Sequence, residues 1–96
     1  MINVAYSFEE VINNPVVKKC INKFKVDHRE KAGEYFYKTF IRHFNAWDSE
    51  ERQEQHSLYN IKKVEWNRKE NCFHVHYKKT KYFGETWYHY TNGRWY

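Results

Sequence analysis

The sequence predicts a two-layer α+β domain, in which N-terminal helices pack on one face of a C-terminal antiparallel meander of three to four strands. Three patterns support this. Phenylalanine recurs every four positions within residues 27–47, residues 59–96 alternate as strands do, and Asn92-Gly93 is a strong hairpin signal. A chain of 96 residues suits a single domain over residues 1–96, with helices over about 7–57 and the sheet over about 59–96.

Start signals divide the helical part into segments. Ser7 and Glu10 form a capping box, in which each side chain accepts a hydrogen bond from the other residue's free backbone N–H. Asn14 is placed to cap a second helix that begins at Pro15. The apolar face of that helix consists of Val17, Cys20, Ile21 and Phe24. Residues 2–6 form a further candidate strand, but a very short one.

The third helix has the strongest amphipathic pattern in the chain. It is expected to start at Asp27, with Glu30 three residues later. Its core-facing stripe consists of Ala32, Phe36, Phe40 and Phe44, and Trp47 extends it. Gly33 interrupts the helical pattern and suggests close packing on a neighbour. The segment 48–58 has no apolar face, so it is expected to be a solvated connector, with an acidic docking segment as the alternative.

The pairing of the strands follows from their alternation, since a slip of one residue would exchange the two faces. Three hairpins are predicted, closed by the pairs Trp66–Phe73, Thr80–Glu85 and Tyr90–Trp95. The first has a loop of residues 68–71. The second has a loop of residues 81–84, which places His76 opposite His89. The third is predicted to be a type I′ turn at Asn92-Gly93, in which both central residues need positive φ, with His89 opposite Tyr96.

This register sorts the strand residues onto two faces. The inner face should pack on the phenylalanine helix and consists of Val64, Trp66, Phe73, Val75, Tyr77, Tyr88, Tyr90 and Trp95. The outer face is polar and basic yet still aromatic, and consists of Lys63, Glu65, His74, His76, Lys78, Trp87, His89, Arg94 and Tyr96. The sheet as a whole thus has more rings and positive charges than one buried face needs, which predicts a binding surface.

Composition limits the classes of partner and compartment. The net charge of +5 favours an anionic partner, such as nucleic acid or an acidic protein surface. Cys20 and Cys72 lie far apart, and the N-terminus lacks the basic and apolar regions of a signal peptide, so reduced thiols and a cytoplasmic location are expected. No apolar segment approaches the roughly 20 residues that span a membrane, so no membrane partner is expected.

The favoured hypothesis is a non-enzymatic protein that binds nucleic acid or a nucleoprotein complex through the outer face. Trp87 and Tyr96 would stack on bases, a mode used by sheets that bind single strands. Lys63, Lys78 and Arg94 would contact phosphates. His76 and His89 would modulate the charge of this face near neutral pH. No cofactor is expected.

Three alternatives use the same face. The chief one is a protein inhibitor or adaptor of the kind that phages and mobile elements encode, acting on a host or defence nucleoprotein, and dimerisation through the face is a related outcome. A second is a metal site formed by His74, His76 and His89. The third is a nuclease that uses one of those histidines with Lys78. Glycines are too scattered for a phosphate-cradling loop, which argues against an enzyme.

Overall fold

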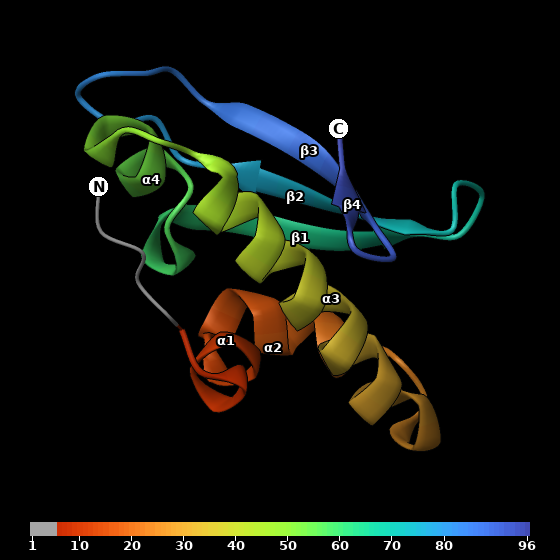
Figure 1. Ribbon diagram of the computed structural model, residues 1–96. Helices are drawn as coiled ribbons and strands as arrows, with labels where there is room; N and C mark the ends of the chain where they lie inside the picture. The colour runs from red at the N-terminus through yellow and green to blue at the C-terminus, as the bar shows by residue number, and fades with distance from the viewer. Residues whose placement is uncertain (1–5) are drawn as a thin grey trace.

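A computed structural model describes residues 6–96 (Figure 1). The elements are α1 (Phe8–Asn13), α2 (Pro15–Ile21), α3 (Val26–Ala46), α4 (Glu50–Gln55), the 3-10 helix η1 (Leu58–Asn60), β1 (Ile61–Asn67), β2 (Cys72–Tyr77), β3 (Thr86–Thr91) and β4 (Arg94–Trp95). The strands form one antiparallel sheet in the order β1-β2-β3-β4, and the helices pack on one side of it (Figure 1). The predicted two-layer α+β arrangement is confirmed. The candidate strand at residues 2–6 lies outside the described residues except for Tyr6.

The first two helix starts are formed as predicted. The Ser7 hydroxyl accepts from the backbone N–H of Glu10, and the Glu10 carboxylate accepts from the backbone N–H of Ser7. The Asn14 side chain accepts from two backbone N–H groups in the first turn of α2. Helix α3 begins at Val26, one residue before the predicted Asp27, and no side chain caps it. The Arg29 side chain instead joins the first turns of α3 to the preceding loop, because it donates to the carbonyl oxygens of Asn22 and Phe24.

Aromatic rings fill the space between α3 and the sheet. Phe36, Phe40 and Phe44 are buried, as their spacing predicts, and Phe36 meets Phe73 of β2 edge-on with 5.3 Å between ring centroids. Rings of this size each remove a large apolar area from water, which offsets the scarcity of leucine. Gly33 lets α1 approach α3, because a Cβ at this position would lie only 3.3 Å from the Ile12 side chain.

The first and third hairpins have the predicted register, whereas the second is shifted by two residues. Trp66 pairs with Phe73 and Tyr90 with Trp95, but Tyr77 pairs with Thr86, so Thr80 and Glu85 lie in a loop of residues 78–85. Strand β2 ends early because the backbone of Lys78 bonds elsewhere: its N–H donates to Asn60 and its carbonyl accepts from the Gln55 and Asn60 side chains. A shift of two residues keeps the side chains of the strands on their predicted faces, but Lys78, predicted on the outer face, lies beyond the end of β2.

The chain departs from the prediction at the third turn. Gly93 has φ of 81°, but Asn92 does not have positive φ, so the expected type I′ turn is not formed. Helix α3 holds this turn in place instead. The Thr39 hydroxyl accepts a hydrogen bond from the Gly93 N–H at 2.9 Å and lies 2.7 Å from the Thr91 carbonyl oxygen.

Segment 48–58 is not the solvated connector that its polarity predicts. It contains α4, and the side chains of Gln53, Gln55 and His56 are buried against the sheet and its loops. The Gln55 amide donates to the carbonyl oxygens of Lys78 and Gly84, which fixes both ends of the loop 78–85.

The edge strand β1 is irregular, because its register with β2 shifts between Ile61 and Lys63. No helix within residues 6–96 is both long and apolar enough to cross a membrane.

Candidate binding surface on the outer face of the sheet

The outer face is arranged in rows that run across the strands. One row contains Lys63, His76 and Trp87, which are successive Cα partners on β1, β2 and β3. The next row contains Glu65, His74, His89 and Tyr96. Tyr96 joins this row because its backbone exchanges two hydrogen bonds with that of His89. None of the described helices covers this face (Figure 1).

Five rings on these rows form a continuous cluster, here named the ring cluster: His74, His76, Trp87, His89 and Tyr96. The imidazole of His76 lies nearly parallel to the indole of Trp87, with an interplanar angle of 11°. The imidazole of His89 lies parallel to the phenol ring of Tyr96, at 7° and 4.5 Å between centroids. Trp87 is 49% exposed and Tyr96 is 65% exposed, so each presents ring surface to solvent.

The predicted pairing of His76 with His89 is wrong, because the second hairpin is shifted. His89 is the partner of His74, and their ring centroids are 4.7 Å apart, whereas His76 is the partner of Trp87. The three histidines proposed as metal ligands are therefore divided between two rows. His76 is occupied in stacking, while His74 and His89 face each other.

Charge on the outer face is mixed. Lys63 forms an ion pair with Glu65 at 3.1 Å, and at the sheet's edge Lys62 pairs with Glu85 at 2.8 Å, all four side chains being more than half exposed. Pairs this exposed contribute little to stability and exchange readily for another ligand. Lys78 and Arg94 are exposed and form no ion pair with any residue of 6–96. They lie at opposite ends of the face, beyond the end of β2 and on β4.

Burial lowers the pKa of His76 below its ordinary value, and the charge of Lys63 lowers it further. His76 is therefore mostly neutral at pH 7 and contributes ring surface rather than charge. The hydrogen bond and the charge of Lys62 lower the pKa of the Glu85 carboxyl. Burial raises the pKa of the Cys72 thiol, and the Glu70 carboxylate raises it further.

Glu70 is a residue of this face that the alternation of the strands does not reveal. It lies in the loop between β1 and β2, yet its carboxylate reaches back over the face. One oxygen lies 2.6 Å from Nε2 of His74 and the other lies 3.4 Å from Nε2 of His89. Its position is set by the loop, where its backbone N–H donates to the Asn67 side chain and Asn71 takes φ of 56°.

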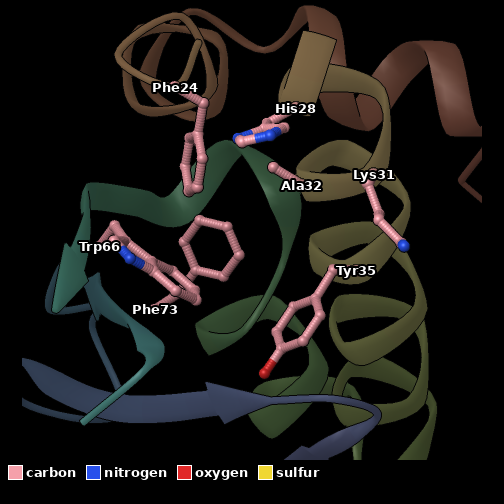
Figure 2. Close-up of a pocket in the computed structure, with 7 residues that line it drawn as sticks. All are labelled: Phe24, His28, Lys31, Ala32, Tyr35, Trp66 and Phe73. Atoms are coloured by element: carbon pink, nitrogen blue, oxygen red, sulfur yellow. The ribbon is translucent and has the colours of Figure 1, made fainter. Parts of the chain in front are cut away.

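A separate pocket of about 190 Å³ opens on the helical side of the sheet (Figure 2). Its lining consists of Phe24, His28, Lys31, Ala32, Tyr35, Trp66 and Phe73. The rings contact one another, with 5.4 Å between the centroids of Phe24 and Trp66, and Lys31 points its amino group away from them (Figure 2). The pocket offers apolar surface but no converging polar groups, so it defines no chemistry.

Comparison with known proteins adds no relationship: no protein-family model, curated protein or solved structure matches this chain. The chemistry of the outer face is therefore the basis for assigning a function.

Proposed function

We propose that this chain is a non-enzymatic protein that binds single-stranded nucleic acid, free or in a nucleoprotein complex, on the outer face of its sheet. The observation that carries the proposal is the pair of exposed rings, Trp87 and Tyr96, each parallel to a histidine on a face without helices. Unpaired bases stack on such rings whatever their sequence, with about 1–3 kcal/mol for each base. Two neighbouring bases would occupy the two ring surfaces.

Cations surround the rings in positions suited to a phosphate backbone. Lys63 adjoins His76 and Trp87 in the same row, while Lys78 and Arg94 lie toward opposite ends of the face. The Lys63–Glu65 pair is exposed, so a phosphate can replace the carboxylate at little cost in free energy. The net charge of +5 adds a general attraction for polyanions. A phosphate beside His76 would favour its protonated form, so affinity should rise as the pH falls below neutral.

The test is fluorescence anisotropy with short labelled single-stranded RNA and DNA. Trp87→Ala and Tyr96→Ala should each weaken binding by roughly 5- to 150-fold, which corresponds to the loss of one stacked base. Tyr59→Ala is the matched control, because Tyr59 is 69% exposed but contacts Tyr6 on the helical side. Absence of binding at low salt, or equal effects of all three substitutions, would contradict the proposal. Cleavage of the labelled strand would instead support the nuclease alternative.

A protein partner is the second candidate, and the mixed charge of the face favours it. Lys62 and Lys63 are already paired with carboxylates, and Glu70 adds negative charge to the ring cluster. Trp, Tyr and Arg are the residue types that dominate protein interfaces, and Trp87, Tyr96 and Arg94 share this face. An inhibitor or adaptor of the phage type would lose its partner on Trp87→Ala, yet its binding would tolerate salt. A second copy of the chain would be detected by concentration-dependent mass in solution.

A further inference from the structure

Three side chains with metal-binding atoms converge at the hairpin end of the outer face, and the ring of His89 lies beside them. The donor atoms of Glu70, Cys72 and His74 all lie within 4.8 Å of one another. His89 adds a fourth, because its Nε2 lies 3.4 Å from a Glu70 oxygen and its ring centroid is 4.7 Å from that of His74. Tetrahedral bonds of 2.0–2.3 Å place ligand atoms roughly 3.3–3.7 Å apart, so the ligand atoms of Glu70, Cys72 and His74 lie near the spacing that one shared ion needs. Rotation of the His89 ring would supply the fourth ligand.

The fold supplies this convergence without distortion. Cys72 and His74 lie two residues apart on β2 and so share a face, and His89 is the Cα partner of His74 on β3. The loop 68–71 then directs the Glu70 carboxylate over both histidines. Cys72 is fully buried beneath the face, whereas the Glu70 side chain is 45% exposed. A metal ion would therefore have a route from solvent and one protected sulfur ligand.

Each ring nitrogen of His89 faces an oxygen. Its Nδ1 lies 3.3 Å from the backbone carbonyl oxygen of Tyr96, and its Nε2 lies 3.4 Å from a Glu70 carboxylate oxygen. A metal ion bound at Nε2 would therefore lie next to the Glu70 carboxylate. A backbone carbonyl that fixes the second nitrogen is the usual arrangement around a metal-binding histidine.

We propose that Glu70, Cys72, His74 and His89 bind one zinc ion. A thiolate, two imidazoles and a carboxylate are a ligand set that suits zinc, and their two negative charges balance those of Zn²⁺. The site keeps His74 and His89 of the three histidines considered as an alternative metal site from the sequence and replaces His76, which is stacked on Trp87. None of the three outer-face cations takes part in it, but His89 also stacks on Tyr96, so the site adjoins the proposed nucleic-acid surface. The ion would join the β1–β2 hairpin to β3.

The experiment titrates the metal-free, reduced full-length chain with Zn²⁺ and, separately, with Co²⁺. One equivalent of metal should bind, the melting temperature should rise with zinc concentration, and the cobalt form should show a sulfur-to-cobalt charge-transfer band. Cys72→Ala should abolish that band and weaken zinc binding at least tenfold. Cys20→Ala is the matched control, because both cysteines are free and buried but Cys20 lies on α2.

Two further variants protect the test against a folding defect at Cys72. His74→Asn and Glu70→Gln act on partly exposed groups, and each should weaken zinc binding at least tenfold while circular dichroism stays unchanged. His76→Ala should leave the affinity as it is. The proposal is overturned if the chain binds less than one equivalent of zinc at micromolar concentration, or if Cys72→Ala and Cys20→Ala bind it equally well. Either result would leave Glu70 as a hydrogen-bond acceptor for the two histidines.

Discussion

His43 and Tyr90 meet inside the core, where Nδ1 of His43 lies 2.6 Å from the Tyr90 hydroxyl oxygen. The same hydroxyl lies 2.6 Å from that of Tyr77, so one buried polar chain joins α3 to β2 and β3. Burial raises the pKa of Tyr90 well above its ordinary value, which keeps its hydroxyl protonated at any ordinary pH. Nε2 of His43 has no hydrogen-bond partner among the described residues, so this ring is poorly prepared to carry a charge.

Acid should therefore destabilise the protein through two buried histidines. Burial lowers the pKa of His43 to about 3, and His56 beside it contributes to the shift. Burial likewise lowers the pKa of His56 to about 4. In the unfolded chain both rings protonate near pH 6.5, so below that pH the unfolded state binds more protons and stability falls. The loss should reach about 2 kcal/mol for each histidine at pH 5 and level off only below the folded pKa values.

Urea denaturation at pH 7 and pH 5 measures this difference. His28→Gln, at an exposed histidine of α3, should keep the dependence on pH. His43→Phe should reduce the difference in the free energy of unfolding between pH 7 and pH 5 by about 2 kcal/mol, even though the variant is less stable at both pH values. Identical pH dependence in His43→Phe and the parent chain would show that His43 is protonated in the folded state.

The two buried glutamines of α4 should respond in opposite ways to leucine. Gln55→Leu leaves the carbonyl oxygen of Gly84 without its side-chain donor and that of Lys78 with the Asn60 side chain alone, which should cost about 1–3 kcal/mol in the free energy of unfolding. Gln53→Leu removes an amide nitrogen that lacks a partner within residues 6–96, so its effect should be neutral or stabilising. Chemical denaturation of both variants measures the change in the free energy of unfolding that each substitution causes. An equal loss in the two would mean that the amide of Gln55 does not hold the loop.

Alanine should be tolerated at Gly84 and not at Gly93. Gly93 has φ of 81°, and a Cβ there would lie 2.5 Å from the Arg42 guanidinium, so Gly93→Ala should cost at least 1–2 kcal/mol, roughly the penalty for a left-handed residue. A Cβ at Gly84 meets no atom within 4 Å, and its φ is not positive. Melting temperatures of the two variants test the difference. A neutral Gly93→Ala would imply that the turn can rearrange away from α3.

Salt dependence should report how many outer-face cations meet phosphates. For single strands, the slope of log affinity against log salt is about −0.7 for each phosphate neutralised. Contacts from Lys63, Lys78 and Arg94 predict a slope near −2, and Lys78→Ala or Arg94→Ala should each make it shallower by about 0.7. Lys31→Ala, on α3 at the rim of the separate pocket, is the control. A slope that none of the variants changes would exclude these side chains as phosphate ligands.

The period of the hydrophobic pattern was sufficient to predict the layers and the two faces of the sheet. Apolar alternation assigns a face to each residue, but it does not set the length of a loop. The predicted pairing of the second hairpin is wrong because the Gln55 and Asn60 side chains donate to the Lys78 carbonyl oxygen, so Lys78 does not continue β2. The Gln55 and Asn60 side chains belong to segments far from Lys78 in the sequence, and the alternation of a strand does not reveal such contacts. The assignment of strand residues to the two faces of the sheet is still correct, because a register shift of two residues leaves each strand side chain on the same face.

The sequence pattern does not predict the burial of several polar side chains. Gln55 and His56 look solvated by composition, and only their tertiary partners show otherwise. His43 carried a usable signal, since it lies three residues after Phe40 on the same helical stripe. Glu70 carried none, because the direction of a loop side chain depends on the turn that holds it.

The irregularity in β1 bears on how the protein behaves when crowded. An exposed sheet edge is a template for pairing with another chain, and natural sheets resist this with bulges and lysines. Strand β1 has both: its register shifts between Ile61 and Lys63, and exposed lysines occupy positions 62 and 63. At the other edge, β4 is only two residues long. Growth of the sheet into aggregates is therefore opposed at both edges.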